Sequence, residues 1–258
     1  MIIHNLDPIF FEIGFISIRW YSLAYIFGIF IGWWYGKKII QKKIDDKRKQ
    51  YYLTEFDNLI TYIIISIIIG GRMGYVIFYN LPYYINNPLD IFKIWEGGMS
   101  FHGALIGIVI GTYIFSIQKK IETFFLLDII ACVSPIGLFF GRVANFINGE
   151  LVGKVTNVYW GVIFPKIDNA TRHPSQLYEA FLEGIILFLL LNFIFFKKNI
   201  KFGSCSAFFL IFYGIFRTFA EIFREPDVQI GYVFESISLG MLLSAFMIFI
   251  GTIILIRK

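Results

Sequence analysis

The residues that most clearly suggest chemistry lie in the stretch GRVANFINGELVG, residues 141–153. After a long apolar run, this stretch gathers Arg142, Asn145, Asn148 and Glu150 among three glycines. An arginine side chain is a planar fork of N–H donors that can grip a phosphate through two parallel hydrogen bonds. Taken alone, however, the stretch is equally consistent with a polar loop between two helices.

A second set of polar residues lies near the end of a later apolar segment and consists of Tyr213, Arg217, Glu221 and Arg224. Their separations of four, four and three residues place them on one face of a helix. Arg217 and Glu221 are spaced to form an ion pair, which would lower the cost of placing either charge in an apolar surrounding. One polar stripe on an otherwise apolar helix is expected to face a cavity.

His102 begins another apolar segment, in the sequence GGMSFHGA. Histidine is the side chain best suited to accept a proton near neutral pH. The neighbouring Gly97, Gly98 and Gly103 allow a backbone or a ligand to approach closely. A lone histidine is nevertheless more often structural than catalytic, so the residues alone leave both roles open.

The sequence RHPSQLYEAFLEG contains two further acidic residues, Glu179 and Glu183. Pro174 suits the first turn of a helix, so much of this motif is typical of helix initiation. The two glutamates then share one face of that helix. We interpret them as packing or water-contacting groups and not as catalytic ones.

The chain shows no nucleophile, metal site or cofactor motif of its own. GxSxG and nucleotide-binding loops are absent, and Cys132 and Cys205 lie in apolar segments without CxxC or metal-ligand spacing. Arginines near a histidine could bind a phospholipid headgroup and stabilise its phosphate as it departs. We therefore expect a transferase that acts on a lipid headgroup, uses no cofactor or metal, and takes its nucleophile from a second substrate.

The composition identifies the solvent in which these residues must be placed. The chain has 258 residues, of which 57% are hydrophobic and 16% charged, whereas a soluble domain carries about 25% charged residues. With a mean hydropathy of +0.70, this surface requires a bilayer. The net charge of +5 does not indicate nucleic-acid binding, because the cations form short clusters between apolar runs.

Seven apolar segments approach the roughly 20 residues that a membrane-spanning helix needs. The first sixteen residues contain no Lys or Arg, so the first segment is expected to be a retained span and not a signal peptide. The sequence predicts an all-α integral membrane protein: one polytopic domain, residues 1–258, formed by a bundle of seven transmembrane helices with outer-face loops at 80–98 and 141–175. The predicted spans are 17–36, 57–79, 99–117, 124–140, 176–196, 204–223 and 234–256.

The distribution of cations predicts the orientation. The connections after the first, third and fifth spans, with the C-terminal end, carry 12 of the 15 lysines. By the positive-inside rule the N-terminus is therefore outside and the C-terminus cytoplasmic. Of eight arginines, only Arg48 and Arg257 fall on the cytoplasmic side. The others are placed to serve the outer half of the membrane.

This orientation brings the costly polar groups of separate spans to one leaflet. A charge at the bilayer centre costs about 2.5–3.5 kcal/mol on insertion scales, so such a gathering is rarely accidental. Snorkelling to the headgroups or ion pairs that fix helix packing would explain it without function. An anionic-solute transporter is a further alternative, although its site should lie near the midplane between repeated halves. A non-catalytic membrane scaffold that only binds its partner remains a third.

Several motifs together resemble one known family. GRVANFINGELVG, GGMSFHGALIG, RHPSQLYEAFLEG and YGIFRTFAEIFREPD are similar to motifs of the bacterial prolipoprotein diacylglyceryl transferases, in the same order. IRWYSLAYIFG and GGRMGYVIFYN extend the resemblance over nearly the whole chain. It implies a multi-pass enzyme of the bacterial inner membrane, with its active site toward the outer, periplasmic leaflet. Such an enzyme transfers diacylglyceryl from phosphatidylglycerol to the lipobox cysteine of a prolipoprotein and releases glycerol phosphate.

The resemblance also implies which residues form the site. They are His102, Arg142 and Arg217 as catalytic residues, and Tyr21, Asn145, Glu150, Gly153, Tyr213 and Glu221 as substrate-binding residues. In the mechanism that we expect, the substrate thiolate attacks the glyceryl carbon that bears the phosphate ester.

Each of these residues has an expected role. His102 is the candidate proton acceptor, Arg217 could instead stabilise the thiolate, and Arg142 holds the lipid phosphate. Asn145 and Glu150 would orient the headgroup or Arg142. Tyr213 and Glu221 would position Arg217.

Overall fold

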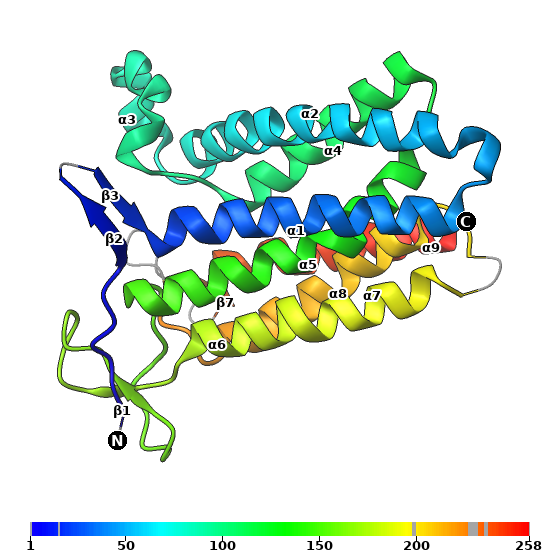
Figure 1. The fold of residues 1–258 in the computed structure, drawn as a ribbon. Coiled ribbons are helices and arrows are strands. Elements are labelled where there is room, and N and C mark those ends of the chain that lie inside the picture. The colour runs from blue at the N-terminus through cyan, green and yellow to red at the C-terminus, as the bar shows by residue number, and fades with distance from the viewer. Residues whose placement is uncertain (1, 15, 198–199, 227–231, 235–236, 258) are drawn as a thin grey trace. The chain divides into compact units, whose positions relative to one another are not determined.

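The computed structural model describes residues 2–257 except 15, 198–199, 227–231 and 235–236. Within them, each of the seven predicted segments contains a helix (Figure 1). These helices are α1 (Trp20–Lys43), α2 (Asp46–Phe78), α4 (Phe101–Lys119), α5 (Thr123–Asn148), α6 (Ser175–Glu179) with its continuations, α8 (Ser204–Glu221) and α9 (Leu239–Ile256). The continuations of α6 are the π-helical η3 (Ala180–Ile186) and then α7 (Leu187–Phe195).

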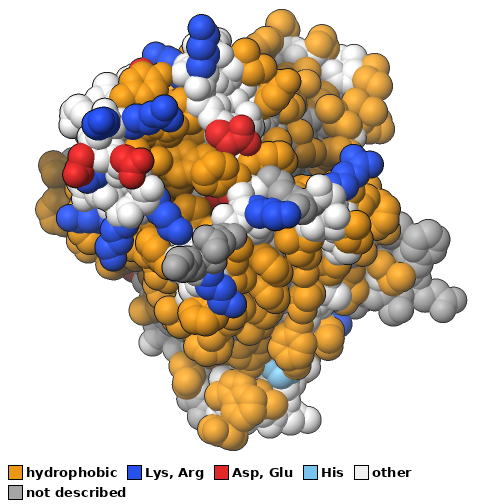
Figure 2. All heavy atoms as spheres, turned by 90° about the vertical axis from the view of Figure 1, so that its right-hand side faces the viewer, with side chains coloured by type: hydrophobic (Ala, Val, Ile, Leu, Met, Phe, Trp, Pro, Cys, Tyr) orange, Lys and Arg blue, Asp and Glu red, His pale blue; other side chains and the backbone are white. Residues whose placement is uncertain are grey.

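The helices have the length and surface expected in a bilayer. Five in the described part of the chain are long and apolar enough to cross a membrane, namely α2, α4, α5, the α6–η3–α7 helix and α9. Large apolar side chains cover much of the helix surfaces, as the orange spheres in Figure 2 illustrate. The protein is therefore a mainly helical, multi-pass membrane protein. The count of seven spans stays a prediction, because α1 and α8 are not among the five.

One shift of a helix boundary falls on the stretch from which the sequence analysis began. Helix α5 does not end at residue 140 but continues to Asn148, so Arg142 and Asn145 are helical. Gly149 ends the helix with a φ of +70°, the left-handed conformation that glycine adopts readily. The segment predicted as a loop from 141 to 175 thus begins as two further helical turns.

Outside the helices the chain forms short strands that the all-α prediction did not include. β1 (Ile2–Ile3), β4 (Val162–Ile163) and β5 (Thr171–Arg172) form a three-stranded sheet in that order. Strands β2 (Ile9–Ile13) and β3 (Ile16–Arg19) form one antiparallel pair, and β6 (Tyr232–Phe234) and β7 (Ile237–Ser238) another. Strands of two to five residues are too short to produce a clear alternation of apolar and polar residues.

The chain divides into two compact units, 1–36 with 128–258, and 37–127. In the second unit α2 and α4 lie side by side through glycines. A Cβ at Gly103 would overlap the carbonyl oxygen of Gly70, and one at Gly107 would overlap that of Ser66. The glycines near His102 therefore include one that serves helix packing, because small residues let two membrane helices approach closely.

The same unit contains a short helical segment held by one arginine. The segment comprises α3 (Leu81–Asn86), η1 (Pro88–Phe92) and η2 (Ile94–Glu96). Buried Arg72 donates hydrogen bonds to five backbone carbonyl oxygens, at distances of 2.6–3.3 Å. These belong to Asp90, Ile91, Lys93, Gly97 and Gly98. Arg72 thus organises the predicted outer loop 80–98.

In the first unit two buried polar side chains fix the helices that carry the candidate site. Asp128 of α5 accepts hydrogen bonds from the backbone N–H of Gly203 at 2.6 Å and of Ser206 at 2.7 Å, and so caps the beginning of α8. Asn192 of α7 donates to the carbonyl of Cys132 at 3.2 Å and accepts from the Tyr35 hydroxyl at 3.0 Å. These bonds tie α1, α5, α7 and α8 together.

Candidate functional site

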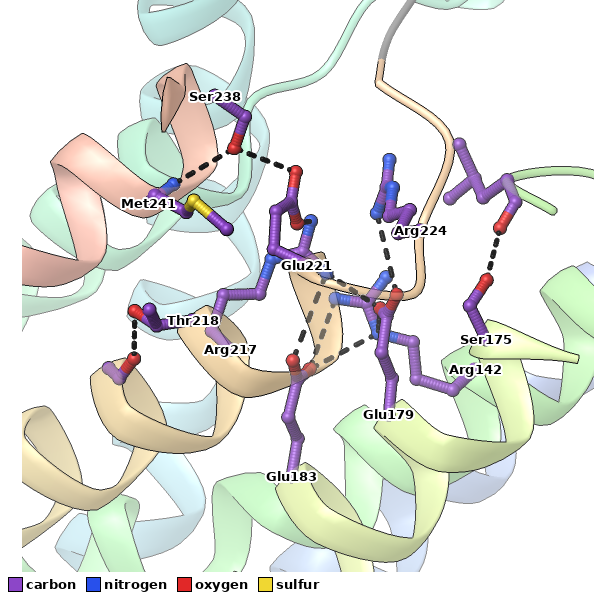
Figure 3. A network of polar contacts seen from close by, with 12 residues as sticks. Arg142, Ser175, Glu179, Glu183, Arg217, Thr218, Glu221, Arg224, Ser238 and Met241 are labelled. Atoms are coloured by element: carbon purple, nitrogen blue, oxygen red, sulfur yellow. Dashed lines mark hydrogen bonds and ion pairs between the residues drawn. The ribbon is translucent and has the colours of Figure 1, made fainter. Parts of the chain in front are cut away.

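The centre of the candidate site is an ion-pair network between helices of the first unit (Figure 3). Arg142 projects from the last turns of α5 toward two carboxylates on the neighbouring α6–η3 helix. Its Nε lies 2.9 Å from Glu179 Oε2, and its Nη2 lies 3.1 Å from Glu183 Oε2. Both contacts are close ion pairs, and Arg142 also donates hydrogen bonds from Nε and Nη2 to Glu183 Oε2, at 3.2 and 3.1 Å.

The stripe predicted on α8 meets the same carboxylates. Arg217 Nη1 lies 2.8 Å from Glu179 Oε2, and its Nη2 lies 2.7 Å from Glu221 Oε2. The pairing of Arg217 with Glu221, predicted from their spacing, is therefore confirmed. Arg224, just beyond the helix, places Nη1 3.7 Å from Glu179 Oε1. Three arginines, one from α5, one from α8 and one from just beyond α8, thus converge on one glutamate.

The network is almost wholly removed from solvent. The side chain of Glu183 is 0% exposed, that of Glu179 1% and that of Arg142, the most exposed, 15%. The formal charges cancel, because the cluster contains three arginines and three glutamates: Arg142, Arg217, Arg224, Glu179, Glu183 and Glu221. Buried charges are tolerated when they are paired in this way, and separating one partner is costly.

The interpretation of Glu179 and Glu183 as water-contacting groups is wrong, and their interpretation as packing groups omits their ion pairs. Their shared helix face is as predicted, but both are buried and ion-paired. Their partner Arg142 lies 37 and 41 positions away, so no local spacing reveals the contact. The available signal was the presence of two acidic residues on an apolar helix, since such residues usually have partners.

A serine links the cluster to a further helix. Ser238 at the beginning of α9 donates from its hydroxyl to Glu221 Oε1 at 2.9 Å. The same hydroxyl oxygen accepts from the backbone N–H of Met241 at 3.2 Å and so caps α9. Glu221 is therefore held at one oxygen by α9 and at the other by Arg217, which supports the expectation that it positions Arg217.

Asn145 and Glu150 form a separate pair beside the cluster. The buried Asn145 side chain donates from Nδ2 to Glu150 Oε1 at 2.7 Å, and Asn148 reaches the same oxygen at 3.4 Å. Gln176 of α6 donates to the backbone carbonyl of Glu150 at 2.6 Å. The exposed Glu150 carboxylate is thus oriented by two amides of α5.

Gly153 lies where three chain segments meet. Its backbone N–H donates to the carbonyl of His173 at 3.0 Å, and it forms a strand-like bridge with Arg224. A Cβ here would overlap the carbonyl of His173 and would lie 2.7 Å from that of Phe223. A side chain therefore cannot be accommodated, which gives this glycine a structural reason to be present.

The remaining predicted residues divide between the two units. Tyr213 is buried on the Arg217 face of α8, within electrostatic range of Arg142 and Glu183. Tyr21 is the second residue of α1 and packs edge-to-face on Tyr25, with 5.1 Å between ring centroids. Tyr25 in turn lies within electrostatic range of Arg142 and Glu150, so it is a neighbour of the site that sequence reasoning missed.

His102 belongs to the unit 37–127. It lies in the first turn of α4, two residues after the N-cap Ser100, whose hydroxyl accepts from the backbone N–H of Gly103 at 3.2 Å. Its ring packs against Phe101 with 5.4 Å between ring centroids. The predicted position of His102 at the start of a helix is therefore confirmed.

A salt bridge orders the loop that follows the site. Arg172 of β5 contacts Asp168 Oδ2 at 2.6 Å and Glu225 Oε2 at 3.2 Å. Its guanidinium, through a hydrogen bond above all, lowers the pKa of the Asp168 carboxyl below its usual range. Arg172 also donates to the carbonyl of Gly153 at 3.0 Å, so the loop is connected to the site by the same side chain.

Together these features define a class: a multi-pass helical membrane protein with arginines and carboxylates buried between its helices. Within the described residues, no group of His, Cys, Asp and Glu could hold a metal ion. The chain belongs to the prolipoprotein diacylglyceryl transferase family, whose model matches residues 8–257.

Similar proteins carry a fuller name, phosphatidylglycerol–prolipoprotein diacylglyceryl transferase. One from Rickettsia bellii is 51% identical over 98% of this chain and 95% of its own length. Another, from Rickettsia typhi, is 51% identical over 100% of this chain and 98% of its own. A third, from Ehrlichia canis, is 52% identical over 95% of this chain and 94% of its own.

Proposed function

We propose that this protein transfers the diacylglyceryl group of phosphatidylglycerol to the thiol of a lipobox cysteine in a prolipoprotein. The product is a thioether, and glycerol phosphate is released. Family membership over nearly the whole chain carries this proposal. The arginine cluster supports it, because an alkyl transfer from a phosphodiester needs cations that stabilise the departing phosphate.

The reaction breaks one C–O bond and forms one C–S bond. The substrate thiolate attacks the glyceryl carbon, and the electron pair of the broken bond stays with the phosphate oxygen. Arg142 holds that phosphate, with Arg217 close enough to share a carboxylate oxygen with it. A free cysteine has a pKa near 8.5, so the thiolate must be favoured by a base or by a positive field. His102 is our candidate base, and Arg217 our candidate for the field.

The other predicted residues act on substrate or on these arginines. Asn145 and Glu150, bonded to each other, form the amide–carboxylate pair that we assign to the glycerol headgroup. Glu221 and Tyr213 position Arg217, and Tyr21 lines the same region through its contact with Tyr25. We assign to Gly153 the close backbone approach that keeps the loop against the site.

We also propose the arrangement in the inner membrane. Seven helices span it, with the N-terminus outside, the C-terminus in the cytoplasm and the active site toward the outer leaflet. The lysine-rich connections support this orientation. The residues of the arginine cluster lie near the end of α5, the start of α6 and the end of α8, which the proposed orientation assigns to one leaflet.

The deciding experiment uses purified protein in phosphatidylglycerol vesicles with a lipobox peptide. We expect glycerol phosphate to appear only when the peptide is present, and the peptide mass to rise by one diacylglyceryl group. Peptide binding without product would favour a scaffold. Uptake of a labelled anion into the vesicles without peptide modification would favour a transporter.

A further inference from the structure

One atom joins Arg142, to which the proposed function assigns the phosphate, and Arg217. Glu179 Oε2 lies 2.9 Å from Arg142 Nε and 2.8 Å from Arg217 Nη1 (Figure 3). Because both nitrogens contact the same oxygen, they lie no farther apart than the sum of these two distances. The two arginines belong to different helices, so this spacing is set by a side chain of a third helix, α6.

The other carboxylates of the cluster do not make this double contact at short range. Glu183 Oε2 lies 3.1 Å from Arg142 Nη2, but Glu183 Oε1 lies 3.8 Å from Arg217 Nη1. Among the described ion pairs, those of Glu221 involve Arg217. To neutralise the charges of Arg142 and Arg217, any nearby carboxylate would be enough. The shared oxygen of Glu179 also fixes their geometry.

The rest of its surroundings limit how far Glu179 can move. Its side chain is 1% exposed, and its second oxygen lies 3.7 Å from Arg224 Nη1. It stands at the last residue of α6, where the π-helical η3 begins, a local geometry often found at functional sites. A group held on a rigid element and by several partners can orient others precisely.

We propose that Glu179 is a positioning residue, which sets the spacing and direction of Arg142 and Arg217 so that both act on one phosphate. The proposal rests on the proposed function. The two carboxylates contact Arg142 along its Nε–Nη2 edge, and we assign its Nη1 side to the lipid phosphate. Glu179 acts through the arginines and takes no part in bond making or breaking.

The test compares Glu179→Gln and Glu179→Asp in the vesicle assay, with kcat and the KM for phosphatidylglycerol measured separately. Gln keeps the shape but loses the charge, and Asp keeps the charge but is too short to reach both arginines. A small misplacement of a catalytic group costs up to about 100-fold in rate. We expect kcat to fall about 10- to 100-fold for both variants, because neither holds the two arginines as glutamate does, with KM changed less than about threefold.

A double variant separates positioning from a general structural role. If Glu179 acts through Arg142, then adding Glu179→Gln to Arg142→Lys should reduce kcat by much less than it does in the wild-type protein. The matched control is Glu55→Gln, which removes a buried carboxylate paired with Lys119 at 3.0 Å in the other unit. We expect it to leave kcat within about twofold, whatever its effect on thermal stability.

Several results would overturn the proposal. They are a folded Glu179→Gln protein with wild-type kcat, a loss of kcat that only follows the folded fraction, or effects of the two substitutions that simply multiply. If Glu179→Gln does not accumulate, the Asp variant and its combination with Arg142→Lys decide the matter by the same criteria. An inactive wild-type protein would overturn the proposed function itself, whereas an active one with an indifferent Glu179 would overturn this inference alone.

Discussion

Side chains of one type perform different tasks in this molecule. The sequence indicates that most arginines serve one half of the membrane, but it does not distinguish among them. Arg72 is occupied by backbone carbonyls, Arg172 by a loop aspartate, and Arg142 and Arg217 by buried glutamates. The pair Arg217–Glu221 could be predicted because it follows helical spacing. The pairing of Arg142 with Glu179 could not, because it depends on how two helices pack.

Arg142→Lys tests the phosphate contact at the residue scale. Lysine keeps the charge but replaces the planar fork with a single ammonium group. We expect the rate of diacylglyceryl transfer to fall by about 100- to 1,000-fold, the usual cost of removing one preorganised donor. The exposed Arg48→Lys provides the matched control and should retain full activity. Near-normal transfer by Arg142→Lys in vesicles would refute a forked phosphate clamp.

The substitution His102→Gln tests whether His102 accepts the proton of the substrate thiol. If His102 is the base, the variant should lose about 100- to 10,000-fold in rate, and the remaining rate should follow pH as the free thiol does. The measurement is kcat/KM for the lipobox peptide between pH 5.5 and 9, taken with protein of equal thermal stability. An unchanged rate and pH profile would leave Arg217 as the group that favours the thiolate.

At the scale of elements, helices were easier to predict than their ends or the strands. Long apolar runs identify α2, α4 and α9 because a bilayer demands such runs. The end of α5 was misplaced because Gly141 and Arg142 resemble a loop in composition, while the helix continues to a glycine with positive φ. Strands of two residues depend on pairing with distant segments, which composition does not record.

Gly107→Ala should separate α2 from α4. Its methyl group would overlap the backbone carbonyl of Ser66, which cannot rotate away. We expect a loss of about 1–3 kcal/mol in stability, the usual cost of overpacking, seen as a lower melting temperature in detergent. The control is Gly137→Ala in α5, where nothing lies within 4 Å of the new Cβ. Equal melting temperatures for both variants would contradict close glycine packing.

The stability of the folded loop before α6 should depend on pH. The Arg172 side chain lowers the pKa of Asp168, so the folded loop favours the ionised carboxylate. This contribution is present above the pKa of an unfolded aspartate, near 3.9, and is lost as pH falls through the lower folded value. Hydrogen exchange at the Thr156 amide, bonded to the Thr171 carbonyl at 2.8 Å, should therefore gain protection as pH rises through that window, after correction for intrinsic exchange. Asp168→Asn should remove this dependence.

At the scale of the whole molecule, composition and lysine distribution determine the environment and predict the orientation, but they do not reveal the two compact units. The boundary after residue 36 falls within α1, and the boundary before residue 128 within α5. A division inside continuous helices leaves no linker, and composition therefore gives no signal of it. Catalytic residues were predicted in both units, His102 in one and Arg142 in the other.

A reporter fusion and an inserted protease site test the proposed orientation. A fluorescent protein that matures only in the cytoplasm, fused after residue 258, should be bright. A protease site inserted next to Tyr159, whose side chain is 87% exposed, should be cut from the outer face of intact spheroplasts. Cleavage only after the membrane is opened would reverse the orientation, and with it the leaflet assigned to the active site.

The Arg72 contacts have a consequence for variation among related sequences. All five carbonyls that it binds belong to the main chain, so the path of residues 88–98 is specified without reference to most of their side chains. Leu89, Phe92 and Trp95 are each more than 70% exposed and can be exchanged while the path is kept. Gly98 is constrained, since its φ is +78° and a Cβ would meet the Tyr75 ring. The segment can thus diversify its outer surface at little cost to its framework.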